Sequence, residues 1–129
     1  MAKKVTLPKL KKKAQETFNA YIRERDKDKP CISSGKTGVM KQAGHFFPVS
    51  TYDGIRFDED NVHGESAYSN CFDEGHLIPY RDNLLERIGK ERFDALYKRA
   101  ADYKKNGYKF TRQELLEIIA LYKKKIEEL

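Results

Sequence analysis

Apolar residues recur every three or four positions over much of the chain, and this spacing predicts amphipathic helices. The first helix is expected to begin at Thr6-Leu7-Pro8, because proline suits the first turn of a helix, and to end near Asp26. A capping-box pattern, threonine followed three residues later by glutamate, starts the last helix at Thr111. Two more helices lie between these, over residues 77–88 and 90–105.

The middle of the chain has a different pattern, with short aromatic stretches interrupted by glycine. This pattern predicts a turn at 31–35, two strands of a small hairpin-like unit at 42–47 and 52–57, a loop or helix start at 58–61, and a short helix at about 64–72. The fold class that follows is α+β, a small ββα core flanked by several helices.

Length and composition narrow the class of protein further. A chain of 129 residues predicts a single domain, in which a basic N-terminal helix or arm (1–30) and a helical C-terminal part (77–129) flank the core (31–76). No apolar run approaches the length of a membrane span, and the lysine-rich start lacks the apolar segment of a secretory signal. Two cysteines are too few for a disulfide framework. We therefore expect a cytoplasmic protein with no membrane partner.

The net charge of +6 is unevenly distributed along the chain. Residues 1–30 carry ten Lys or Arg against four Asp or Glu, whereas residues 53–76 carry one Arg against seven acids. Basic flanks favour a polyanion such as DNA, because each cation near a phosphate releases a condensed counterion. An acidic middle favours a divalent cation. The alternative is that the lysine-rich helices are only solvated faces.

Three positions in the middle segment follow the order of an HNH, or ββα-metal, nuclease. His45 follows Gly44 on the first predicted strand, Asn61 lies 16 residues later, and Asn70 lies 9 residues after that. In that chemistry a strand histidine is the general base for an attacking water, and a loop asparagine orients it through a hydrogen bond. A histidine or asparagine on the helix helps to hold one divalent cation.

The segments around these residues resemble the zinc-binding pairs of treble-clef HNH domains. The first pair would be Cys31 and Ser34, and the second Ser66 and Ser69. Serine is not a structural zinc ligand at neutral pH, so we expect no structural zinc. We expect hydrogen bonds and apolar packing to hold this knuckle instead, with Cys31 as a small buried side chain.

From about Leu10 onward, the chain resembles the lambda NinG (Rap) recombination endonuclease family of phages and prophages. The stretches that carry the resemblance are 10–14, 29–33, 43–46, 55–63, 77–81, 85–89, 108–110 and the final helix. The resemblance implies a structure-selective endonuclease that cuts branched DNA, such as Holliday junctions and D-loops, and needs Mg²⁺ or Mn²⁺. It places the protein in the bacterial host of a phage or prophage.

Site residues follow from the motif and the resemblance together. His45 and Asn61 are the catalytic candidates, and Asn70 is the first metal-ligand candidate. Gly44 stands where many HNH enzymes have a ligand, so His63 or His76 is expected to supply the missing one. The candidate DNA-binding residues are Lys9, Lys11, Lys12, Lys13 and Arg81. Each candidate also has an ordinary alternative. His45 would be a core histidine, Asn61 a helix cap and His76 a loop histidine. The lysines would form a solvated basic tail.

Other functions stay open from the sequence alone. The missing cysteines and Gly44 favour a DNA-binding protein of the same fold that has lost catalysis, which would bind junctions without cutting them. A protein-interaction adaptor would show no salt-sensitive DNA binding. Two symmetric cuts in a junction favour a homodimer. The apolar stripe of the last helix fits either an intrachain core or a dimer seam.

Overall fold

The structure is a computed structural model that describes residues 4–39, 41–71 and 74–129. Two strands form an antiparallel pair, and helices precede and follow them, so the fold is α+β as expected. The elements in chain order are α1 (Leu7–Arg25), β1 (Lys41–His45), the 3₁₀ helix η1 (Asp53–Ile55), β2 (Val62–Ser66), α2 (Ala67–Cys71), α3 (Leu77–Ile88), α4 (Lys90–Asn106) and α5 (Arg112–Glu127). In these described residues, no helix combines the length and apolar character that a membrane span needs.

The four long helices begin and end close to where local sequence signals place them. The Thr6 side chain caps α1 by accepting a hydrogen bond from the Lys9 amide (3.4 Å). Thr111 and Glu114 form the complete capping box at the start of α5. Helices α3 and α4 end before Gly89 and Gly107, whose φ angles of 84° and 67° favour glycine. These helix predictions are confirmed.

The second strand is not the predicted one. Residues 52–57 were expected to pair with β1, but they form η1 and a turn, and β2 lies at Val62–Ser66 instead. Gly54 packs so closely on Tyr103 that an added Cβ would lie 2.1 Å from its ring. Asp53 forms an ion pair with Lys11. Ile55 packs with residues of α3 and α4, and Phe57 packs against α1 and α5. Contacts with helices, rather than strand pairing, therefore explain the apolar residues of this segment.

The short helix starts later than expected because β2 takes its first residues. Helix α2 begins at Ala67 and runs to Cys71, rather than from Gly64. The last residue of the predicted helix, Phe72, lies outside the described residues, as does Asp73. The order strand, strand, helix is nevertheless the predicted one.

Strand pairing decides which side chains share a face of the sheet. Gln42 pairs with Glu65, and Gly44 pairs with His63. Directly paired residues point to the same face, and alternate residues of one strand do too. These four residues therefore lie on one face of the two-stranded sheet.

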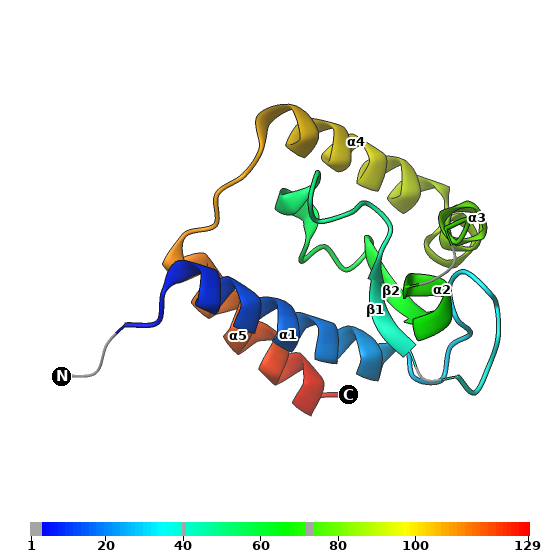
Figure 1. Ribbon diagram of the computed structural model, residues 1–129, viewed down its shortest axis with the longest axis horizontal. Coiled ribbons are helices and arrows are strands. Elements are labelled where there is room, and N and C mark those ends of the chain that lie inside the picture. Colours follow the sequence, from blue (N-terminus) through cyan, green and yellow to red (C-terminus); the bar gives the residue numbers. More distant parts are fainter. Residues whose placement is uncertain (1–3, 40, 72–73) are drawn as a thin grey trace.

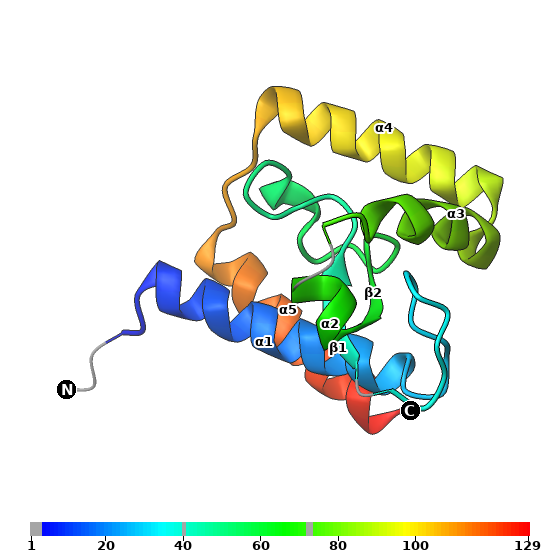
Figure 2. The same cartoon turned by 45° about the vertical axis from the view of Figure 1, so that its right-hand side comes forward.

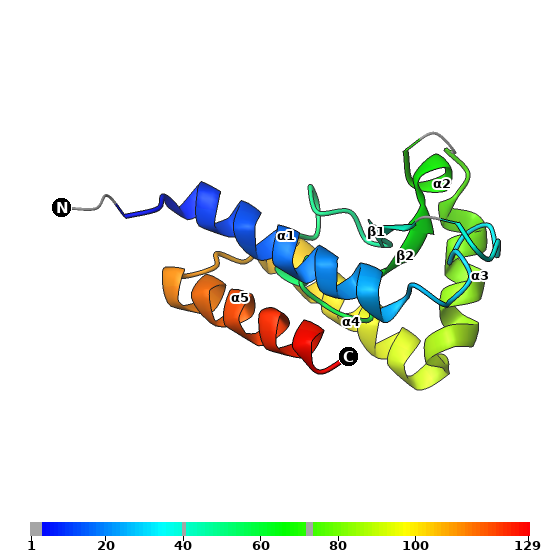
Figure 3. The ribbon, with the colours of Figure 1, turned by 90° about the horizontal axis from the view of Figure 1, so that it is seen from below.

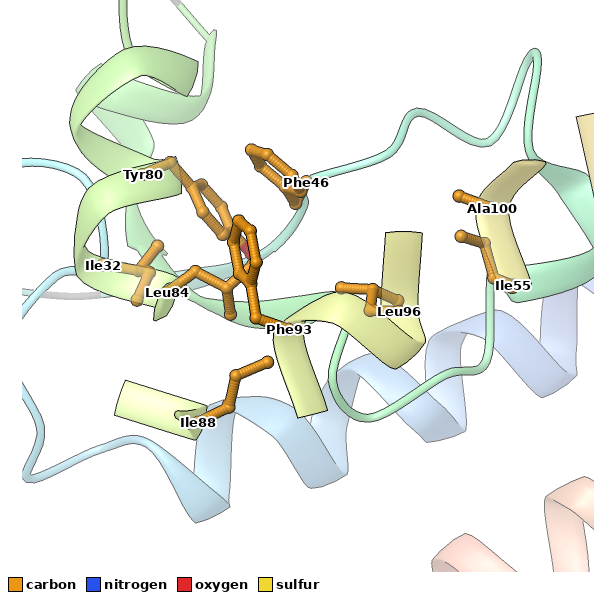
Figure 4. Packing of buried hydrophobic residues seen from close by; sticks show 9 residues of the cluster. All are labelled: Ile32, Phe46, Ile55, Tyr80, Leu84, Ile88, Phe93, Leu96 and Ala100. Atoms are coloured by element: carbon orange, nitrogen blue, oxygen red, sulfur yellow. The ribbon is translucent and has the colours of Figure 1, made fainter. Parts of the chain in front are cut away.

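The helices enclose the strands from two sides. Helices α1 and α5 run side by side below the sheet, and α4 crosses above it, as the views in Figures 1 and 2 agree. The view from below shows the long contact between α1 and α5 (Figure 3). Residues from α3 and α4 pack with Ile32, Phe46 and Ile55 in one hydrophobic cluster (Figure 4). Two further clusters join α1 to α5.

Candidate functional site

His45 ends β1, and its ring is held by the backbone of the segment that follows η1. Its Nε2 lies 3.0 Å from the carbonyl oxygen of Arg56. A carbonyl oxygen only accepts, so Nε2 carries the proton and Nδ1 carries the lone pair. Burial lowers the pKa of His45, and the Arg56 charge adds to this, against the opposing effect of the Arg56 carbonyl. The ring is therefore neutral near pH 7 and able to accept a proton.

Asn61 is fully buried and fastens the two backbone segments that flank this histidine contact. Its Nδ2 donates to the carbonyl oxygens of Phe47 (3.1 Å) and Ile55 (3.3 Å). Its Oδ1 accepts from the Phe47 amide at 2.8 Å. Phe47 lies two residues after His45, and Ile55 directly precedes Arg56. Asn61 thus makes no hydrogen bond to the His45 ring itself, but fixes the backbone on both sides of it.

Asn70 reaches β1 from the short helix α2. Its Nδ2 donates to Oε1 of Gln42 at 2.8 Å. Gln42 also accepts a weaker contact from the Cys71 thiol, at 3.5 Å. Asn70 therefore lies beside the sheet face that carries Gln42 and Gly44.

His76 lies next to the same face through a residue that the sequence analysis missed. Its Nδ1 is 2.6 Å from Oε2 of Glu65 on β2. The Glu65 side chain is completely buried, and its Oε1 has no hydrogen-bond partner within the described residues. A Cβ added at Gly44 would lie 2.5 Å from that oxygen. Placing residues 62–66 on a strand opposite Gly44 would have revealed Glu65.

His63 lies on the same sheet face, but both of its ring nitrogens already have partners within the protein. Nε2 donates to the Asp60 carbonyl at 3.0 Å, and Nδ1 accepts from Nη2 of Arg25 at 3.3 Å. Burial, followed by the Arg25 charge, lowers the pKa of His63 to about 3. His63 is accordingly a neutral, structural histidine that connects the end of α1 to the segment before β2.

In the described residues, His, Cys, Asp and Glu side chains do not by themselves form a metal site. Among the described residues, no three or more His, Cys, Asp or Glu side chains are grouped closely enough to hold a metal ion. A cation on the Glu65 face would therefore need amide oxygens as well, and Asn70 and Gln42 are the amides beside it.

The four knuckle positions come together through hydrogen bonds. The Cys31 sulfur accepts from the backbone amides of Ser34 (3.4 Å) and Ser66 (3.1 Å). The Ser66 hydroxyl donates to the Ser69 hydroxyl at 3.1 Å. Burial raises the pKa of Cys31, but hydrogen bonds from Ser33, Ser34 and Ser66 outweigh it and lower the pKa to about 6. Cys31 is therefore a hydrogen-bond acceptor and more than a small apolar filler.

The basic candidates differ in how free they are. Lys9, Lys12 and Lys13 are exposed on α1, whereas Lys11 forms an ion pair with Asp53 (2.6 Å). Arg81 lies on α3, where its guanidinium stacks over Phe93 at 5.4 Å. Residues of α1 and Arg56 line a surface depression, and Arg56 donates to Gln15 of α1 at 2.8 Å. The basic part of α1 is thus joined to the segment that holds His45.

Comparison with known proteins gives the family. Residues 2–129 match the family described as "Bacteriophage Lambda NinG protein". The chain is 39% identical over 119 residues to "Protein ninG" of Escherichia phage 933W, 40% to that of Salmonella phage P22 and 38% to that of Escherichia phage lambda. Each alignment covers 92% of this chain, but only 56% or 57% of the relative.

The chain therefore spans a little over half the length of these curated relatives. No solved structure matches it. The match over nearly the whole chain and the identities near 40% lead to one conclusion: the chain belongs to the NinG family of bacteriophage proteins.

Proposed function

We propose that this chain is a metal-dependent, structure-selective endonuclease of the HNH type that cleaves branched DNA in phage recombination. The observation that carries the proposal is the buried Asn61, which fastens the backbone on both sides of the contact between His45 and Arg56. A general base must be held in a fixed position and tautomer to act on a bound water. This arrangement supplies both.

His45 is the general base in the proposed reaction. The Arg56 carbonyl holds the proton on Nε2, so Nδ1 accepts the proton of the attacking water. The lowered pKa keeps the ring neutral at physiological pH, which is the form that a base requires. Asn61 is a positioning residue, because it acts on the ring only through the backbone.

The proposed divalent cation lies beside the sheet face of Gly44, where the buried Glu65 Oε1 has no hydrogen-bond partner among the described residues. The residues that would hold it are Asn70 and Glu65, whose carboxylate is hydrogen-bonded to His76. When bound, Mg²⁺ or Mn²⁺ stabilises the negative charge that develops on the phosphate and on the leaving oxygen. Both the metal requirement and the DNA substrate are part of the proposal.

The exposed lysines of α1 supply the DNA contacts in this proposal. They are linked to the base through Gln15 and Arg56, so a duplex that lies along α1 passes near His45. Lysine at a phosphate contributes affinity without sequence readout. Such binding suits an enzyme that recognises branched shape rather than sequence.

The test is a cleavage assay on a synthetic four-way junction and a matched linear duplex, with Mg²⁺, Mn²⁺ or EDTA. We expect metal-dependent cuts in the junction, and at least about a 100-fold loss of cleavage in His45→Ala with junction binding retained. Ser50→Ala, at an exposed loop position, is the control and should cut like wild type.

A second function has support in Gly44, which offers no ligand of its own, and in the serines of the knuckle. That function is a DNA-binding protein without catalysis. Tight, salt-sensitive junction binding by wild type with no cut under any metal condition would establish it and reject the endonuclease. The absence of salt-sensitive DNA binding would reject both and favour a protein-interaction adaptor.

A further inference from the structure

Within the described residues, one buried carboxylate has a hydrogen bond at only one of its two oxygens. Glu65 is completely buried on β2, and Oε2 accepts from His76, while Oε1 has no partner among the described residues. A carboxylate oxygen that is removed from water without a partner costs free energy, and buried charges in proteins are usually paired or bound to a metal. Glu65 Oε1 is therefore a candidate ligand for a cation.

The position of this oxygen is set by the absence of a side chain across the strand pair. A Cβ at Gly44 would lie 2.5 Å from Glu65 Oε1 and 3.0 Å from Glu65 Cβ. A side chain at position 44 and the Glu65 carboxylate would thus compete for the same space. The carboxylate from β2 takes the place that a ligand on β1, next to His45, would otherwise fill.

Oxygen donors of the right kind lie around the carboxylate. Gln42 is the direct strand partner of Glu65, and Asn70 is hydrogen-bonded to Gln42. Carboxylate and amide oxygens are the side-chain ligands that Mg²⁺ and the similarly hard Mn²⁺ prefer, with water completing the shell. Mg²⁺ is usually held by only one or two protein carboxylates and keeps several waters.

We propose that Glu65 Oε1 is the anionic ligand of a divalent-cation site on the sheet face shared by Gln42, Gly44 and Glu65, completed by Asn70. This inference rests on the proposed function, because it names the ligand of the cation that the proposed cleavage uses. It assigns the role to a strand glutamate that the motif His45, Asn61, Asn70 does not contain.

His76 acts in this site as a positioning residue. Its Nδ1–H donates to Oε2 at 2.6 Å, which fixes the carboxylate so that Oε1 faces Gly44. Hydrogen bonds of this kind from outside the ligand shell orient a metal-binding group and tune its affinity. The side chain of His76 is only partly buried, so it also lies between the carboxylate and the surface.

The first test is a titration of the full chain with Mn²⁺, in which electron paramagnetic resonance measures the free ion. We expect stoichiometric binding by wild type and at least about tenfold weaker binding by Glu65→Gln, since even residues outside the ligand shell cost that much. Glu117→Gln, an exposed glutamate on α5, is the matched control and should bind like wild type.

Variants of His76 separate positioning from direct ligation. His76→Ala is expected to weaken Mn²⁺ binding less than Glu65→Gln does, and His76→Asn, which keeps an N–H donor, to restore part of the loss. A greater loss in His76→Ala than in Glu65→Gln would overturn the assignment, because it would make His76 the ligand. Wild-type affinity in a folded Glu65→Gln variant would also overturn it.

A second measurement uses the unaltered protein and does not depend on variants that fold. The chain has three histidines, so their ring signals are resolvable by nuclear magnetic resonance. Paramagnetic Mn²⁺ below one equivalent should broaden the ring signals of His76 before those of His63. Unchanged His76 signals at one equivalent would overturn the site.

The Mn²⁺-binding experiments and the cleavage assay test the two proposals separately. His45→Ala should bind Mn²⁺ like wild type while losing cleavage. If wild type binds Mn²⁺ through Glu65 and cuts no DNA, the site stands and the proposed endonuclease falls. If wild type cuts DNA and Glu65→Gln keeps its Mn²⁺ affinity, the endonuclease stands and the site falls.

Discussion

His63 shows how a single buried histidine makes the fold sensitive to acid. It lies between Arg25 of α1 and the Asp60 carbonyl, with 3% of its surface exposed. Its pKa of about 3 is well below the ordinary value of 6.5. The unfolded chain binds a proton at this residue below about pH 6.5, and the folded chain does not, so acid favours unfolding.

The first prediction here follows from that difference. Between about pH 6 and pH 4.5, proton uptake at His63 in the unfolded chain should lower the free energy of unfolding by about 2 kcal/mol. His63→Gln should show a flatter pH dependence in urea denaturation. Some slope will remain, because burial lowers the pKa of His45 as well. Equal slopes for wild type and His63→Gln would contradict the prediction.

At the residue scale, the sequence indicates the candidate residues that follow a motif. It does not indicate the candidate whose surroundings depend on strand pairing. His45, Asn61 and Asn70 stand at the intervals of a known motif, so the sequence alone makes them candidates. Glu65 becomes notable only when it faces Gly44 and His76. That neighbourhood depends on residues 11 and 21 positions apart, which no local pattern encodes.

At the scale of elements, local signals set the positions of some helices, whereas non-local contacts set the position of the second strand. The starts of α1 and α5 are predictable, because the side chains of Thr6 and Thr111 cap them through backbone amides three residues later. The second strand is not, since β2 is chosen by its pairing with β1 and by contacts such as the Gly64 amide donating to Asp26 (2.8 Å). Strand preference depends on such surroundings more than helix preference does.

A cap that the sequence displays so plainly should also be measurable. Thr111→Ala removes the hydroxyl that accepts from the Glu114 amide at 3.1 Å, and should cost about 1 kcal/mol of unfolding free energy. Thr17→Ala is the matched control, because this hydroxyl lies inside α1, where it donates to the Lys13 carbonyl. It should change stability by less than about 0.5 kcal/mol. Equal losses in both variants by urea denaturation would reject the capping explanation.

For the whole molecule, the proposed function and the distribution of basic residues together predict which surface binds DNA. On the proposed function, the exposed Lys12 and Lys13 of α1 contact phosphates, whereas Lys104 and Lys105 at the end of α4 do not. Helix α4 lies across the sheet from α1 (Figure 1). The two pairs carry the same charge, so they make a matched comparison.

Replacing Lys12 and Lys13 by alanine should weaken junction binding and lower the slope of log affinity against log salt by about 2. Replacing Lys104 and Lys105 by alanine should leave that slope nearly unchanged. Fluorescence anisotropy of a labelled junction over a range of salt concentrations measures both. If the two double variants lose the same slope, the effect is that of net charge, and α1 is not the DNA-binding surface.

The pairing of α1 with α5 has a consequence for how the protein is made. Leu10 and Ala14 of α1 are buried against Leu115 and Ile119 of α5, and the Phe18 ring lies 4.7 Å from that of Tyr122. A ribosome releases α1 before α5. The apolar stripe of α1 therefore lacks its α5 partner while about 90 further residues are synthesised. Translation speed and chaperones that shield nascent chains thus bear directly on its yield.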